Sequence, residues 1–94
     1  MDRPSFEEFE SAARRDGYDE VLARSWDGGL AIAEHEHPFA VKALVVAGEM
    51  WLIERGGTKH LRPGDGFELA ASVPHAERYG PEGATYWAAR RNAP

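Results

Sequence analysis

Two of the four histidines in this chain, His35 and His37, lie two residues apart in the stretch "AEHEHP". Side chains of a β-strand alternate between its two faces, so both imidazoles would point one way, while Glu34 and Glu36 would point the other way. Two imidazoles on one face can bind a metal ion. The alternative is a polar strand whose histidines face solvent, because short motifs often occur without a site.

A third imidazole, His75, begins a later predicted strand, just after a turn. Three neutral imidazoles in one place would suit Fe, Zn, Ni, Cu or Mn and would leave coordination positions open. The chain has no cysteine, so the ligands of any metal must be nitrogen and oxygen atoms. The fourth histidine, His60, lies beside a turn, matches no ligand position and is expected at the surface.

Glu77 and Tyr79 follow His75 by two and four residues, which places them on its face of a regular strand. We therefore take both as candidate catalytic residues, acting as a base or a hydrogen-bond donor, and Glu77 as a candidate metal ligand. The alternative for Glu77 is a solvated or ion-paired residue at the rim of the fold.

The N-terminal segment, residues 1–17, predicts one helix. Ser5 can cap its first turn, with Glu8 three residues later as in a capping box. Gly17 suits the left-handed conformation that closes many helices.

After residue 17 the sequence consists of short apolar segments separated by Gly, Pro and Asp, a texture typical of antiparallel barrels and sandwiches. No linker or repeat interrupts the chain, so residues 1–94 predict a single domain, with an all-β barrel or sandwich over residues 18–94. The predicted strands are residues 21–26, 30–36, 41–46, 50–55, 59–61, 66–69, 75–79 and 84–90.

The segment "EMWLIER" is apolar on both alternating faces, which predicts a strand that is covered on both sides. The N-terminal helix or a second subunit would provide the outer cover. We expect a homodimer, since Trp51 and Ile53 would otherwise form an exposed apolar stripe.

The formal net charge of −5 argues against a nucleic-acid partner, which would require concentrated Lys and Arg. The basic pairs Arg14-Arg15 and Arg90-Arg91 are expected to be solvated ends of elements. The sequence shows no signal-peptide pattern and no apolar stretch long enough to span a membrane, so we expect a cytoplasmic protein without a membrane partner.

Two stretches resemble the two motifs of the cupin family. The first motif is G-x5-H-x-H-x(3,4)-E-x6-G, and the second is G-x5-P-x-G-x2-H-x3-N. The resemblance implies a double-stranded β-helix barrel of six to eight strands, of the cupin or jelly-roll type, with three histidine ligands for a divalent metal ion. The matching residues are Gly29, His35, His37 and Gly48 in the first motif, and Gly64 and His75 in the second.

The departures from these motifs are as informative as the matches. Val41 stands where the first motif has a ligand glutamate, and Tyr79 stands where the second has asparagine. Ala70 and Ser72 replace the proline and glycine of the second motif. The chain thus resembles a three-histidine cupin, and whether Glu77 replaces the missing carboxylate is left open by the sequence. Some three-histidine cupins are iron dioxygenases.

The resemblance implies two kinds of function. The first is a mononuclear metalloenzyme acting on a small organic substrate, dioxygenase-like with iron or copper, or a Lewis-acid isomerase or lyase with Zn, Ni or Mn. The alternative is a non-catalytic module that binds or senses a small ligand, because a fold of this kind hosts many unrelated activities.

Overall fold

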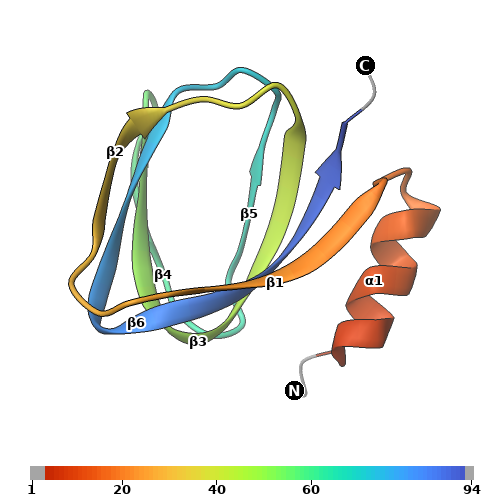
Figure 1. Ribbon diagram of the computed structural model, residues 1–94, viewed down its shortest axis with the longest axis horizontal. Coiled ribbons are helices and arrows are strands. Elements are labelled where there is room, and N and C mark those ends of the chain that lie inside the picture. The colour runs from red at the N-terminus through yellow and green to blue at the C-terminus, as the bar shows by residue number, and fades with distance from the viewer. Residues whose placement is uncertain (1–3, 93–94) are drawn as a thin grey trace.

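The computed structural model describes residues 4–92, so residues 1–3 of the segment predicted as helix lie outside the described residues. One helix precedes six strands, and the prediction of an all-β fold with a short N-terminal helix is confirmed (Figure 1). The elements are α1 (Phe6–Arg15), β1 (Glu20–Trp26), β2 (Ala31–His35), β3 (Ala40–Glu54), β4 (Gly57–Leu61), β5 (Gly66–Leu69) and β6 (His75–Arg91).

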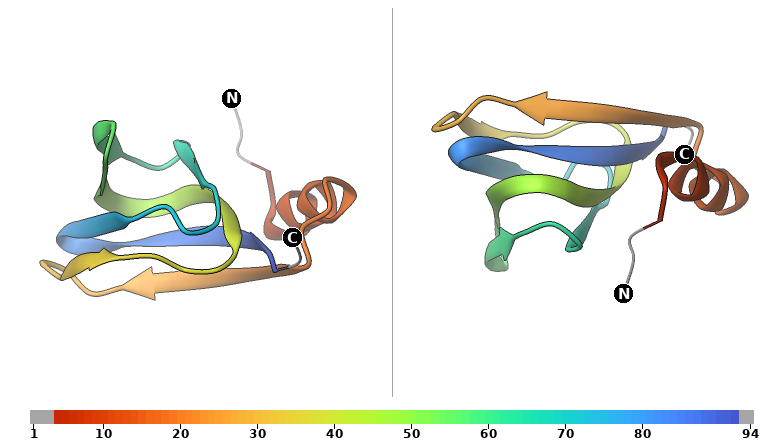
Figure 2. Two further views of the ribbon diagram at one scale, coloured as in Figure 1. Left: turned by 90° about the horizontal axis from the view of Figure 1, so that it is seen from above. Right: turned by 90° about the horizontal axis from the view of Figure 1, so that it is seen from below.

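All strand pairs are antiparallel. The order β1-β6-β3-β4 forms the main path, β2 pairs with β6, and β5 pairs with β3. The early part of β6 pairs with β2 and its later part with β1, while β3 divides in the same way between β5 and β4. The two long strands therefore curve and contribute to both sides of the barrel, as Figures 1 and 2 show.

The long strands β3 and β6 each combine two segments that the sequence predicted as separate strands. Their pairing shifts register on both sides of Gly48, which has a φ of 72°. A Cβ at Gly48 would lie 2.0 Å from the carbonyl oxygen of Gly83 on β6, itself at a φ of 75°. Only glycine permits this approach of the two backbones, so the chain bends here without leaving the sheet.

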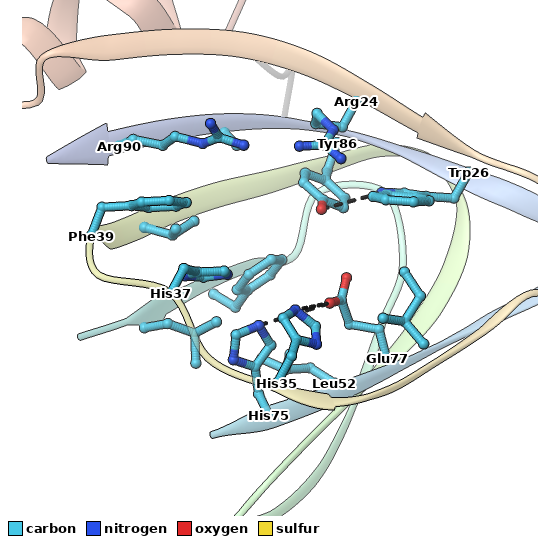
Figure 3. Close-up of a pocket in the computed structure, with 15 residues that line it drawn as sticks. Arg24, Trp26, His35, His37, Phe39, Leu52, His75, Glu77, Tyr86 and Arg90 are labelled. Atoms are coloured by element: carbon cyan, nitrogen blue, oxygen red, sulfur yellow. Dashed lines mark hydrogen bonds and ion pairs between the residues drawn. The ribbon is translucent and has the colours of Figure 1, made fainter. Parts of the chain in front are cut away.

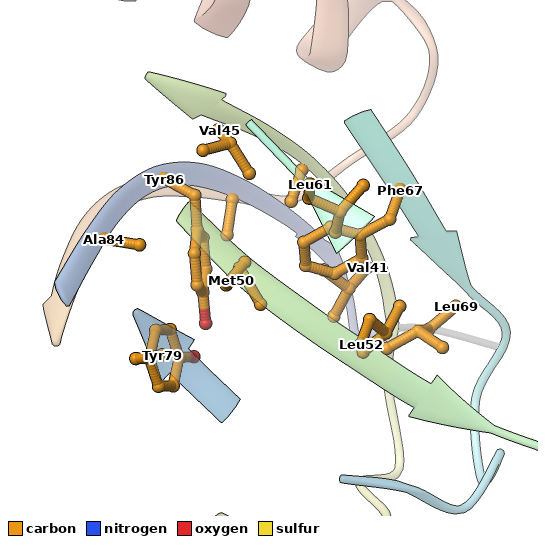
Figure 4. Close-up of a cluster of buried hydrophobic side chains, with 12 residues drawn as sticks. Val41, Val45, Met50, Leu52, Leu61, Phe67, Leu69, Tyr79, Ala84 and Tyr86 are labelled. Atoms are coloured by element: carbon orange, nitrogen blue, oxygen red, sulfur yellow. The ribbon is translucent and has the colours of Figure 1, made fainter. Parts of the chain in front are cut away.

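Alternate residues of the strands meet inside the barrel and form its apolar core (Figure 4). Val45, Met50 and Leu52 of β3 are fully buried at its centre. Around them lie Val41, Ala43, Leu61, Phe67, Leu69, Tyr79, Ala84, Tyr86 and Ala88.

The helix α1 begins at the predicted capping box: Ser5 Oγ accepts from the backbone N–H of Glu8, and the Glu8 carboxylate accepts from the Ser5 N–H. Its buried residues Phe9 and Ala13 form a second cluster with Ala89, against which Trp87 packs. The helix thus covers an outer face built by β1 and β6 (Figure 2). No helix within residues 4–92 has both the length and the apolar character to cross a bilayer.

Trp51 and Ile53 are half-buried. The helix does not provide their cover, because it packs against Ala89 and Trp87 instead. The ring of His60 stacks on Trp51 with a centroid separation of 4.6 Å, and the Arg78 guanidinium lies 5.5 Å from the Trp51 ring. Intramolecular contacts therefore cover part of this stripe, and the homodimer stays a prediction. His60 also contacts the Glu49 carboxylate at 2.7 Å, on the surface as expected.

Candidate metal centre

A pocket of about 160 Å³ lies inside the barrel and is lined by residues of β1, β2, β3, β5 and β6 and of the segment between β2 and β3 (Figure 3). Its volume is below the roughly 300–1,000 Å³ that is usual for drug-sized ligands. Apolar side chains form most of its wall, and a few charged or polar groups face into it. The charged and polar side chains that line the pocket are those of Arg24, His35, His37, His75, Glu77, Tyr86 and Arg90.

The three histidines predicted as ligands lie together. One potential ligand atom of each of His35, His37 and His75 lies within 4.8 Å of the others. Their ring centroids are 4.3 Å apart for His35 and His75, 4.8 Å for His37 and His75, and 5.6 Å for His35 and His37. Segments 40 residues apart in sequence thus converge at one point, as three-histidine coordination requires.

Strand pairing accounts for this convergence. His35, the last residue of β2, pairs directly with His75, the first residue of β6. The register shifts between Ile32 and His35, and this irregularity lets both side chains face the pocket although they are three residues apart. Glu34 and Glu36 are exposed, so the predicted division between histidines and glutamates holds.

Hydrogen bonds to the backbone orient two of the imidazoles. Nδ1 of His35 lies 2.9 Å from the carbonyl oxygen of Ala33, and Nδ1 of His75 lies 2.9 Å from that of Val73. A carbonyl only accepts, so Nδ1 carries a proton in both rings, and in the neutral tautomer that this selects the lone pair is on Nε2. Such bonds are the usual support of a metal-binding histidine, and the residues present fit a divalent metal ion.

The third imidazole, His37, stacks on the ring of Phe39, with centroids 4.4 Å apart and planes nearly parallel. Burial lowers the pKa of His37 below its ordinary value, and the neighbouring His75 lowers it further. Both effects favour the neutral imidazole that coordination needs.

Glu77 brings a carboxylate to the same place. Its side chain is buried, and Oε2 lies 3.5 Å from Nε2 of His35 and 3.8 Å from Nε2 of His75. Val41, at the position of the glutamate in the first cupin motif, lines the pocket without a polar group. A carboxylate is therefore present at the cluster, and it comes from β6 instead of β3.

Tyr79 lies behind Glu77 and does not line the pocket. Its hydroxyl donates a 2.5 Å hydrogen bond to Oε1 of Glu77. Burial, followed by this bond to Glu77, raises the pKa of Tyr79 far above its ordinary value, so the hydroxyl stays protonated. The bond holds Oε1, while Oε2 faces His35 and His75.

The sequence patterns did not single out two charged residues of the pocket, Arg24 and Arg90. The expectation that Arg90 is a solvated end is corrected here: it is partly buried and faces the pocket from β6. The alternation of side chains along β6 could have predicted the place of Arg90, because Tyr86, Ala88 and Arg90 follow one another at steps of two and all line the pocket.

Comparison with known proteins finds no matching family model and no matching curated protein. Several solved structures share the fold. An RmlC-like cupin from Shewanella frigidimarina is 26% identical, with a TM-score of 0.69 over 78% of this chain. A chain from the crystal structures of the DMSP lyases RdDddP and RnDddQII is 27% identical (TM-score 0.71, 78% of this chain), and the DMSP lyase DddQ from Ruegeria pomeroyi is 25% identical (TM-score 0.70, 76%).

The chain spans 65% of the Shewanella cupin but only 38% and 36% of the two lyase chains. The chain is therefore a small protein of cupin fold, similar to the RmlC-like cupins, with three histidines clustered at its pocket and valine at position 41, where the first cupin motif has glutamate.

Proposed function

We propose that this protein is a mononuclear metalloenzyme, in which His35, His37 and His75 bind a divalent metal ion and Glu77 transfers a proton of a small organic substrate. The observation that supports this proposal is the convergence of the oriented Nε2 atoms of His35 and His75 beside Oε2 of Glu77. When bound, the ion would act as a Lewis acid on a substrate oxygen.

The chain itself supplies a base that is held in place. The hydroxyl of Tyr79 donates a hydrogen bond to Oε1 of Glu77, and Oε2 faces the pocket. Oε2 is therefore the oxygen that would accept a proton from the substrate. Phe67 and Leu69 line the same pocket with apolar side chains. Proton transfer beside a Lewis acid is the chemistry of isomerases and lyases, and we place the protein in that class.

The likeness to DMSP lyases, at 27% and 25% identity, supports the lyase class, although one fold hosts many reactions. Iron-dependent dioxygenase chemistry would use the same histidines but would not need an oriented carboxylate. A non-catalytic binding module is the second candidate, favoured by the small cavity of about 160 Å³.

Metal analysis of the purified, untagged protein tests the histidine cluster. We expect close to one divalent ion per chain in the parent and its loss in His35→Ala and His75→Ala. The matched control is His60→Ala, which removes an imidazole outside the cluster and should keep the metal. A parent that takes up none of Fe, Zn, Cu, Ni or Mn would remove the basis of the proposal.

Glu77→Gln tests proton transfer, because the amide keeps the shape and cannot act as a base. With the metal-loaded protein in D₂O, NMR would follow C–H exchange in a panel of small keto and hydroxy acids. We expect exchange in the parent and a loss of about 100-fold or more in Glu77→Gln. Exchange by neither protein, together with oxygen consumption by the iron-loaded parent, would assign the dioxygenase class instead. Metal binding without either reaction would assign the binding module.

A further inference from the structure

Two arginines, Arg24 on β1 and Arg90 on β6, line the pocket together with the histidines. Each guanidinium lies over an aromatic ring: Arg24 is 4.8 Å from the Trp26 centroid, and Arg90 is 4.6 Å from that of Phe39. Figure 3 shows the two arginines along one side of the pocket and His35, His75 and Glu77 along the other. Stacking of this kind holds a guanidinium in place while leaving its N–H edge free to donate.

Few contacts within residues 4–92 use the donors of these arginines. Arg24 makes no ion pair with an acidic side chain of residues 4–92. Arg90 has one loose contact, 3.7 Å from an oxygen of Glu20, whose side chain is half exposed. A guanidinium has five N–H donors, so both arginines retain donors for a ligand.

The charges of the pocket differ in sign from those of the whole protein. Arg24 and Arg90 oppose one carboxylate, Glu77, which leaves one net positive charge with neutral histidines (+2 − 1 = +1). The chain as a whole has a formal net charge of −5. A positive pocket in an acidic protein attracts anionic ligands to that pocket and away from the rest of the surface.

We propose that Arg24 and Arg90 bind a carboxylate group of the substrate, so that the pocket takes a small organic carboxylate whose other end reaches the histidines and Glu77. This inference rests on the proposed function for the reaction at that other end. The planar guanidinium matches a carboxylate through paired hydrogen bonds. The apolar lining from Ile32, Phe39 and Val41 suits a short carbon chain.

A phosphate group fits the pocket less well. The two charges of a phosphate dianion exceed the single net positive charge of the pocket, and phosphate sites usually add backbone N–H groups at a helix N-terminus. The one helix within residues 4–92, α1, packs against the outer face of the barrel and does not line the pocket. A singly charged carboxylate is therefore the better match.

An NMR titration of the full chain with propionate tests this site, with propionamide as a neutral probe of the same shape and inorganic phosphate as the competing anion. The indole N–H of Trp26, which lies in the pocket wall, reports binding. The titration is run with one equivalent of Zn²⁺ and again after EDTA. We expect Arg24→Gln and Arg90→Gln each to weaken propionate binding about tenfold or more in both states, the effect of lost hydrogen bonds to a charged group.

The matched control is Arg78→Gln, because Arg78 also lies over a tryptophan ring but outside the pocket. It should bind propionate as the parent does. Propionamide that binds as tightly as propionate, phosphate that binds more tightly, or arginine variants that bind propionate like the parent would each overturn the carboxylate site.

Metal content separates this inference from the proposed function. The arginine variants should keep the zinc of the parent, because neither arginine belongs to the histidine cluster. Suppose that the parent binds propionate but no metal, and that Arg24→Gln no longer binds propionate. The proposed reaction then fails and the carboxylate site stands. If zinc binds at the histidines and the arginine variants behave as the parent, the carboxylate site alone fails.

Discussion

The hydroxyl of Tyr79 and the carboxylate of Glu77, two residues apart on β6, share a buried hydrogen bond of 2.5 Å. This bond determines which oxygen of Glu77 faces His35 and His75. Tyr79 stands in place of the asparagine of the second cupin motif. It contacts Glu77 but does not itself line the pocket.

The first prediction concerns Tyr79→Phe at alkaline pH. Because burial and the bond to Glu77 raise the pKa of Tyr79, the native state keeps the proton that the unfolded chain releases near pH 10. The native state then binds more protons than the unfolded state, so the free energy of unfolding must fall as pH rises above about 10, by up to about 1.4 kcal/mol per pH unit for this group. Urea unfolding at several pH values from neutral to alkaline should show a smaller fall in Tyr79→Phe. An equal fall in both proteins would contradict this account.

The second prediction concerns the pH dependence of metal retention. Protons compete with the metal for imidazole, so retention should decline as pH falls below about 6, near the ordinary histidine pKa. The lowered pKa of His37 resists this competition, since the buried ring favours its neutral form. Equilibrium dialysis over a pH series, followed by metal analysis, measures the decline. Retention that is constant down to acidic pH would point to ligands other than these histidines.

The third prediction compares two glycines with positive φ. A Cβ at Gly48 would lie 2.0 Å from the carbonyl oxygen of Gly83, whereas a Cβ at Gly29 would have no atom within 4 Å. Gly29→Ala should therefore cost only the strain of the left-handed conformation, about 1–2 kcal/mol. Gly48→Ala should cost more than about 4 kcal/mol or prevent folding, because β3 and β6 could no longer approach each other. Thermal unfolding compares the two variants, and equal losses would show that the close approach is unimportant.

The fourth prediction is that Ser72→Gly stabilises the protein. Ser72 has a φ of 63°, and its backbone N–H donates a 2.8 Å hydrogen bond to the carbonyl oxygen of His37. Glycine keeps this bond and relieves the strain, for a gain of about 1 kcal/mol in the free energy of unfolding. Ser72→Ala is the control, since alanine retains the strain and should give no gain. Chemical denaturation measures both, and an equal gain in the two variants would rule out the backbone explanation.

Several features of the protein follow from local sequence. The helix begins at Ser5 because its capping side chain and Glu8 are neighbours in the chain, and the interaction needs no tertiary contact. His35 and His37 both line the pocket, as their spacing of two residues predicted, although β2 ends at His35. The resemblance to the two cupin motifs predicted that His75 would lie beside His35 and His37, and the structure brings the three histidines together.

The tertiary structure decided how the other polar groups are arranged around that pocket. Arg90 is the last residue but one of β6, and it lines the pocket with its guanidinium over the ring of Phe39. The first cupin motif has a glutamate where this chain has Val41, and Glu77 supplies a carboxylate beside the histidines instead. It reaches them because β6 pairs with β2, the strand that carries His35. The sequence by itself determined the start of the helix and the alternation that puts Glu77 on the face of His75, since these depend on neighbours a few residues away. The meeting of His75 with His35 and His37, and the place of Arg24 beside them, depend on strand pairing between distant segments, which no local pattern encodes.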